Sequence, residues 1–66
     1  MLVWINGECR ELLAGASVLD ALVALGAPDT GVAVAVDGEV VPRVDWTATD
    51  LAEGARVEVL TAVQGG

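Results

Sequence analysis

The chain has 66 residues, of which 55% are hydrophobic, and ten acidic against three basic residues give a formal net charge of −7. A chain of this length forms one domain, residues 1–66, near the lower size limit for folding alone. The three arginines are dispersed, which excludes the clustered cations that nucleic-acid binding needs. No apolar run approaches the roughly 18 residues of a membrane span. With a single cysteine, Cys9, and no signal-peptide pattern, we expect a soluble, cytoplasmic protein that is monomeric when free.

Side chains suited to catalysis are scarce. The sequence has no His, the usual acid–base residue near neutral pH, and no Lys, which excludes Schiff-base chemistry. Asp45, Asp50 and Glu53 form a loose acidic cluster, but their spacing matches no metal-binding loop. The composition therefore favours a protein that is not itself an enzyme and that holds no metal and no cofactor.

The first 13 residues predict a β-hairpin. Residues 1–5 are apolar on both faces, and Asn6-Gly7 follows them. This dipeptide is the strongest short hairpin signal, because both positions tolerate the positive φ of a type I′ turn. Residues 8–13 then return as the second strand.

One short amphipathic helix follows. Ser17 is typical of a helix N-cap, and Asp20 lies three residues later, as in a capping box. Val18, Leu22 and Leu25 recur at the spacing of one helix face. Gly26 ends the helix, and Pro28 prevents it from continuing.

The second half of the sequence predicts three more strands. Residues 32–36 are β-branched and small in alternation, Asp37-Gly38 forms a turn, and residues 39–41 return until Pro42 ends the strand. Residues 43–51 predict a loop with one helical turn around residues 45–51. Residues 56–61 form the last strand. The order β-β-α-β-β-β predicts an α+β fold, a mixed sheet of four to five strands packed on one helix.

A single helix covers only one face of such a sheet, so the strand pattern divides the residues into two sets. We expect one set to face the helix: Val3, Ile5, Val18, Leu22, Leu25, Val32, Val34, Val36, Val57 and Val59. The opposite set, Leu2, Trp4, Ala33, Ala35, Leu60 and Ala62, is more apolar than solubility requires. Two interpretations stay open for it: partial cover by residues 43–51, or a docking surface for a partner. The docking candidates are Trp4, Leu2, Leu60, Ala62 and Ala35.

The sequence ends in Gly65-Gly66 directly after the last strand. These glycines are either a frayed end or a free carboxylate on a slender, flexible tail of residues 62–66. Glycine has no Cβ, so a partner's backbone could close around such a tail where other residues would clash.

Taken together, these features resemble the β-grasp (ubiquitin-like) fold of small sulfur carriers, and specifically the thiamin-biosynthesis sulfur carriers, the ThiS family. The resemblance covers essentially the whole chain. Asp37, where the family usually has Asn, and Ala55, where Asp is common, depart from the family pattern without affecting its chemistry. The segments that carry the resemblance are residues 32–43, which end in Val-Pro-Arg, Trp46, residues 56–60 and residues 62–66.

This resemblance implies that Gly66 carries the covalent chemistry. In the family, an ATP-dependent adenylyltransferase joins the terminal glycine carboxylate to AMP, so ATP is used by the activating partner. A persulfide sulfur from a cysteine desulfurase system then replaces the AMP and leaves a thiocarboxylate. Thiazole synthase takes that sulfur for the thiazole ring of thiamin. Gly65, Gln64 and Val63 would be the tail residues that the partners recognise.

Two alternatives remain at this point. The small subunit of molybdopterin synthase shares the fold and the thiocarboxylate, but the Val-Pro-Arg segment with Trp46 favours thiamin. The second alternative is a non-covalent regulatory β-grasp module whose terminal glycines have no role.

Overall fold

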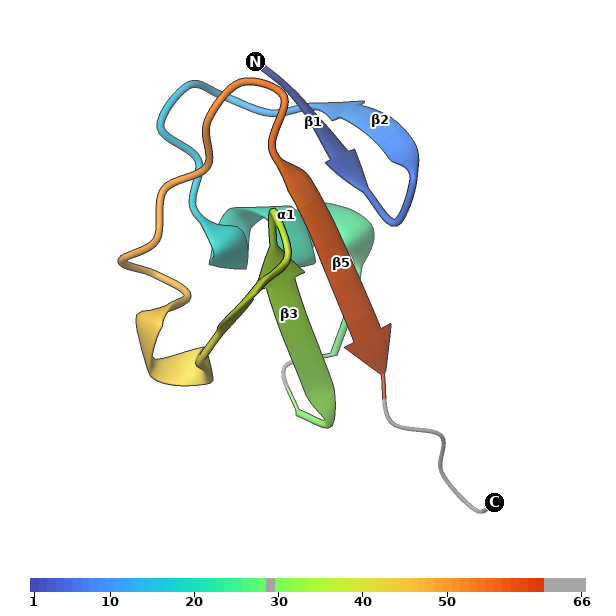
Figure 1. Cartoon of the computed structure of the whole chain (residues 1–66), viewed down its shortest axis with the longest axis vertical. Coiled ribbons are helices and arrows are strands. Elements are labelled where there is room, and N and C mark those ends of the chain that lie inside the picture. Colours follow the sequence, from blue (N-terminus) through green and yellow to red (C-terminus); the bar gives the residue numbers. More distant parts are fainter. Residues whose placement is uncertain (29, 62–66) are drawn as a thin grey trace.

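The computed structural model describes residues 1–28 and 30–61 (Figure 1). This part of the chain forms five strands and one α-helix in the predicted order β-β-α-β-β-β. In chain order the elements are β1 (Leu2–Ile5), β2 (Glu8–Glu11), α1 (Val18–Leu25), β3 (Val32–Val36), β4 (Glu39–Val41), a 3-10 helix (Arg43–Asp45) and β5 (Arg56–Thr61).

The strands form a single mixed sheet in the order β2-β1-β5-β3-β4. β1 and β5 run parallel, whereas the other neighbours are antiparallel. Positive φ angles at Asn6 (51°) and Gly7 (83°) confirm the predicted type I′ turn. Asp37 (50°) and Gly38 (85°) confirm the second predicted turn, and their φ angles are of the same type. The second strand is shorter than predicted: its pairing with β1 ends at Glu11, beyond which Leu12 N–H still donates to Met1 O at 2.8 Å.

The ends of α1 agree with the sequence signals. Asp20 N–H donates to Ser17 Oγ at 3.3 Å, and Ser17 N–H donates to Asp20 Oδ2 at 2.9 Å, which completes the capping box. Gly26 ends the helix in the left-handed region, with φ of 75°. At eight residues α1 is short, and no helix among the described residues is long and apolar enough to cross a membrane.

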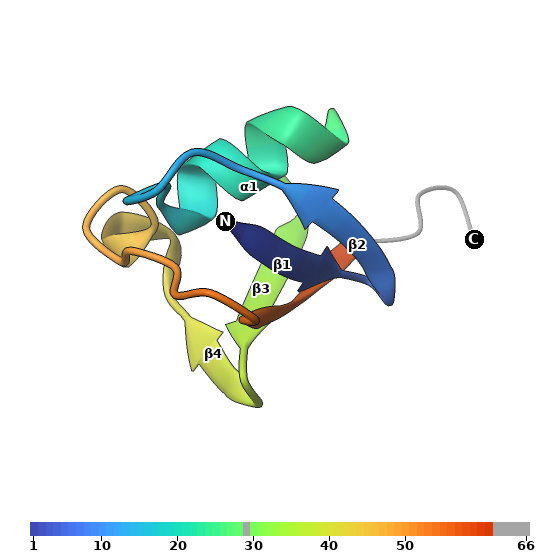
Figure 2. The same cartoon turned by 90° about the horizontal axis from the view of Figure 1, so that it is seen from above.

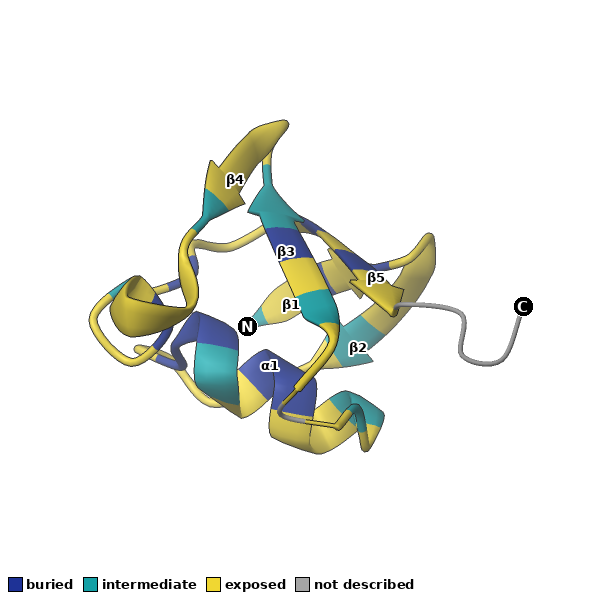
Figure 3. Ribbon diagram, turned by 90° about the horizontal axis from the view of Figure 1, so that it is seen from below, coloured by how far each residue is buried: buried dark blue, intermediate teal, exposed yellow. Residues whose placement is uncertain are grey.

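The core lies between α1 and one face of the sheet (Figures 2 and 3). Most residues predicted to face inward are buried there, while Leu25, Val32 and Val36 are half-buried and pack at its rim. The buried members of the core are Val3, Ile5, Val18, Ala21, Leu22, Val34, Trp46, Leu51, Ala55, Val57 and Val59.

The segment between β4 and β5 differs from the prediction. Its helical turn spans Arg43–Asp45 and not residues 45–51, because Pro42, with φ of −60°, is already set for a helix start. Trp46 follows and is buried, with its Nε1–H donating to Val41 O at 2.9 Å. We find that this tryptophan covers one end of the core.

The same segment packs beside the N-terminus of α1. Val18 N–H donates to Thr49 O at 2.9 Å, and Leu51 N–H donates to Ala16 O at 2.8 Å. These bonds hold the segment on the helix side of the sheet. It therefore enlarges the core and does not cover the opposite face. This excludes the interpretation that residues 43–51 partly cover the apolar side chains of that face.

The capping box yields a test of helix stability. We expect Ser17→Ala to lower the free energy of unfolding by about 1 kcal/mol, because Asp20 N–H loses its acceptor at the helix start. Urea denaturation measures this change. Thr47→Ala, in an exposed turn, serves as the control and should change stability by less than about 0.5 kcal/mol. An equal loss in both variants would contradict the role of the cap.

Candidate functional site

The sheet face opposite α1 carries several exposed apolar side chains, and we call it the open face. Residues paired across neighbouring strands point to the same side of a sheet, so the register assigns its members. They are Leu2 and Trp4 in β1, Cys9 and Glu11 in β2, Ala33 and Ala35 in β3, Val40 in β4, and Arg56, Glu58 and Leu60 in β5.

The docking candidates lie on this face as the strand pattern predicts. Leu60 is 68% exposed, Leu2 48% and Trp4 45%, which is high for large apolar side chains. Ala35 is half-buried beside them. Ala62 lies outside the described residues, so its place on the face stays a prediction.

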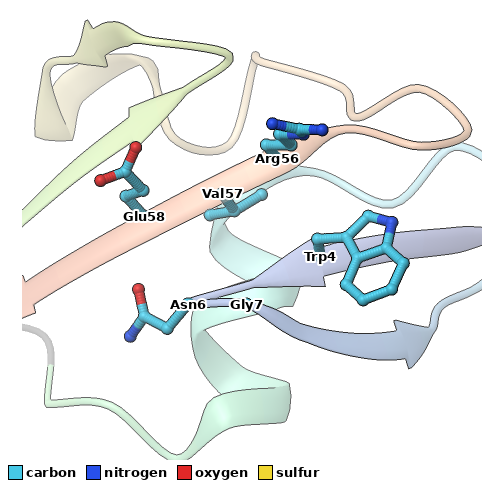
Figure 4. Close-up of a pocket in the computed structure, with 6 residues that line it drawn as sticks. All are labelled: Trp4, Asn6, Gly7, Arg56, Val57 and Glu58. Carbon is cyan, nitrogen blue, oxygen red and sulfur yellow. The ribbon is translucent and has the colours of Figure 1, made fainter.

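A hollow of about 530 Å³ opens on this face between β1 and β5. Trp4 contributes from β1, Arg56 and Glu58 from β5, and the turn residues Asn6 and Gly7 close one end (Figure 4). Trp4 and Arg56 are register partners in the parallel pair. An aromatic ring, a guanidinium and a carboxylate around a shallow apolar floor suit recognition of a protein surface.

Arg56 and Glu58 were missed as site residues by the sequence reasoning. Their signal was present, because Arg56, Glu58 and Leu60 alternate with the buried Val57 and Val59 along one strand. That alternation places both charges on the same side as Leu60.

Among residues 1–28 and 30–61, the cysteine and the acidic side chains singled out in the sequence lie apart from one another or have structural partners. Cys9 is exposed on the open face, as the register partner of Trp4. The Glu53 carboxylate accepts from Leu2 N–H at 3.2 Å through both oxygens, so it anchors the start of β1. In the described part of the chain, no three His, Cys, Asp or Glu side chains are grouped closely enough to hold a metal ion.

Val63, Gln64, Gly65 and Gly66, the predicted functional tail, lie outside the described residues. The structure does fix where they are attached. β5, which ends at Thr61, lies between β1 and β3 in the middle of the sheet. The terminal segment therefore begins at the end of the central strand, next to the open face.

Comparison with known proteins agrees with this geometry. The model of the ThiS family matches residues 3–66. The chain is similar to the crystal structure of a thiamine biosynthesis protein (ThiS) from Geobacter metallireducens, with 30% identity, full coverage of both chains and a TM-score of 0.82. It is also similar to an NMR solution structure of a thiamine biosynthesis protein from Geobacter metallireducens, with 32% identity over 100% of this chain and 88% of that chain and a TM-score of 0.81. A search of curated proteins finds no match.

The family match spans all but the first two residues, and both solved structures share the fold. The mixed sheet on one helix is the β-grasp, ubiquitin-like arrangement that the sequence predicts. The chain belongs to the ThiS family.

Proposed function

We propose that this protein is a sulfur carrier for thiamin biosynthesis, whose Gly66 carboxylate is adenylated and then converted to a thiocarboxylate. The observation that carries the proposal is the family match, which runs through Gly66. The architecture is consistent with it, because β5, the strand that leads into the terminal segment, lies at the centre of the sheet and carries Leu60 on the open face. The two similar structures, both of thiamine biosynthesis proteins, support thiamin over molybdopterin as the pathway.

The chemistry requires little from the carrier itself. A carboxylate is a poor acyl donor, so an ATP-dependent adenylyltransferase must first join it to AMP. The terminal sulfur of a persulfide, generated by a cysteine desulfurase system, attacks the acyl carbon and expels AMP, which leaves an acyl disulfide. A thiol then cleaves the S–S bond of this intermediate, which releases the thiocarboxylate and forms a disulfide between the two thiol groups. Thiazole synthase consumes the thiocarboxylate. With no His and no Lys, this chain acts as a protein co-substrate and not as the catalyst.

The tail has the length that such a division of roles needs. Residues 62–66 extend up to ~17 Å at about 3.4 Å per residue. That distance lets Gly66 enter a buried active site while the folded body stays at its entrance. Gly65 supplies slim backbone, and Gln64 and Val63 provide side chains for the partner to recognise.

The open face would dock the carrier on its partners. Trp4 and Arg56 belong to the residue types that contribute most to binding at protein interfaces, and the exposed Leu60 lies two residues before the tail. The net charge of −7 favours association with a basic partner surface. The adenylyltransferase and thiazole synthase would therefore contact the same face and the same tail.

Intact mass spectrometry tests the covalent chemistry directly. After incubation with ATP, a sulfur source and the adenylyltransferase, we expect the mass to rise by the exchange of one oxygen for one sulfur, located at Gly66. An unmodified protein, or sulfur bound at Cys9, would contradict the proposal. Transfer of that sulfur by thiazole synthase, and not to a molybdopterin precursor, would identify the pathway.

Appending one Ala after Gly66 separates a carrier from a non-covalent module. We expect thiocarboxylate formation to be abolished, because the reacting carbonyl is displaced and gains a neighbouring Cβ. The midpoint of thermal unfolding should not change, which shows that the fold is intact. Retention of normal thiocarboxylate yield would favour the regulatory module instead.

Docking through the open face predicts a selective effect of Leu60→Asp. We expect its affinity for the adenylyltransferase to fall at least about tenfold, because a desolvated carboxylate would replace an apolar contact. Leu13→Asp is the matched control, since Leu13 is 86% exposed and lies in the loop before α1. Titration calorimetry measures both affinities. Equal losses in the two variants would assign the effect to charge and not to the face.

A further inference from the structure

The side chain of Asn6 reaches the strand that leads to the tail. Asn6 Oδ1 accepts from Val59 N–H at 2.8 Å, and Asn6 Nδ2–H donates to Val59 O at 3.2 Å. Its backbone N–H also donates to Val57 O at 2.9 Å. One residue of the β1–β2 turn therefore makes three hydrogen bonds to β5.

These bonds continue the sheet beyond the end of β1. The parallel pairing of β1 with β5 reaches Ile5 and Val57, after which the chain turns away at Gly7. The amide of Asn6 then presents one acceptor and one donor to Val59, as the backbone of another strand residue would. β5 is thereby held on its β1 side up to Val59, within two residues of its last residue, Thr61.

The second type I′ turn holds the other end of the same strand. Asp37 N–H donates to Arg56 O at 2.8 Å, and Asp37 Oδ1 accepts from Arg56 N–H at 3.0 Å. Asn6 and Asp37 have nearly equal φ angles, 51° and 50°. They form a matched pair, in which Asp37 binds β5 at its start and Asn6 binds it near the tail.

We propose that Asn6 is a positioning residue for acyl transfer at Gly66. By holding Val59, it fixes the end of β5 from which the terminal residues, Gly66 among them, continue. Without it, Val59 would lose its partner on the β1 side and would be paired with β3 alone, as Leu60 and Thr61 already are. The part of β5 that is held on one side only would then lengthen from two residues to three. A longer free segment lowers the effective concentration of its end at a fixed site and adds residues that the partner must order. This inference rests on the proposed function, but its structural half is testable in the free protein.

Amide hydrogen exchange of the free full-length chain tests the anchor. Asn6→Gly removes the side chain and keeps a residue suited to positive φ. We expect exchange at Val59 and Leu60 to become roughly tenfold faster, with Arg56 unchanged. Asp37→Gly is the matched control and should accelerate exchange at Arg56 only. Unchanged exchange at Leu60 in Asn6→Gly would overturn the proposal.

Adenylation kinetics test the positioning role. We expect Asn6→Gly to lower kcat/KM for adenylation of Gly66 about fivefold, because the tail starts from a looser strand. The kcat/KM of Asp37→Gly should stay within about twofold of the wild-type value, since the hydrogen bond that this variant loses lies at the opposite end of β5 from the tail. Equal decreases in the two variants, or a wild-type kcat/KM in Asn6→Gly, would overturn the proposal.

Asn6→Asp provides a second variant should Asn6→Gly not fold. It has the same shape and keeps the acceptor for Val59 N–H, but an oxygen replaces the donor that faces Val59 O. We expect Asn6→Asp, too, to speed up amide exchange at Leu60 and to lower kcat/KM for adenylation. Wild-type values of both quantities in this variant would overturn the proposal. A wild-type chain that is never adenylated would instead contradict the proposed function, while the exchange pattern still decides whether Asn6 anchors the strand.

Discussion

The structure depends on the placement of β5 between β1 and β3. Each of the two hairpins, β1–β2 and β3–β4, forms from residues close in sequence, but only β5 joins them into one sheet. An isolated two-stranded hairpin is marginally stable in water, so neither half would persist alone. Because β5 completes the sheet, the segment that follows it is attached to the central strand. The same topology therefore joins the two hairpins and sets where the terminal segment is attached.

The single helix has an equally direct consequence. It buries one face of the sheet, and the segment containing Trp46 packs on that same side instead of covering the other. The open face therefore keeps Trp4 and Leu60 exposed. Small side chains on β3 and the charges of Arg56 and Glu58 limit its apolar area, while the overall negative charge opposes self-association. These features are compatible with a surface that binds partners transiently.

Local signals in the sequence were sufficient for most of the fold. The Asn-Gly and Asp-Gly turns, the Ser17 cap and the Gly26 stop each act over a few residues, and the structure confirms all of them. Pro42 was a local signal for the start of the 3-10 helix that the sequence analysis read only as the end of a strand. The packing of the following segment on α1 was not predictable, because it depends on bonds between residues distant in sequence, such as Leu19 N–H to Trp46 O.

The difference between local signals and contacts between distant residues also applies to the candidate site. Strand alternation predicted that Trp4 and Leu60 share the open face, and the register confirms it. The role of Asn6 was hidden, because its turn propensity already explained its presence. Its side-chain bonds to Val59 span 53 positions and exist only once β1 and β5 are parallel neighbours. Such contacts follow from topology and not from local sequence.

The most direct test of the central claim, that the open face and the tail together meet the activating enzyme, is an NMR titration of the full chain with the purified adenylyltransferase. We expect the first changes in chemical shift at the Trp4 indole, the Leu60 methyl groups and residues 62–66. The chemical shifts of the Val23 methyl groups, on the exposed side of α1, should stay unchanged. Changes centred on Val23, with the open face unaffected, would contradict the claim.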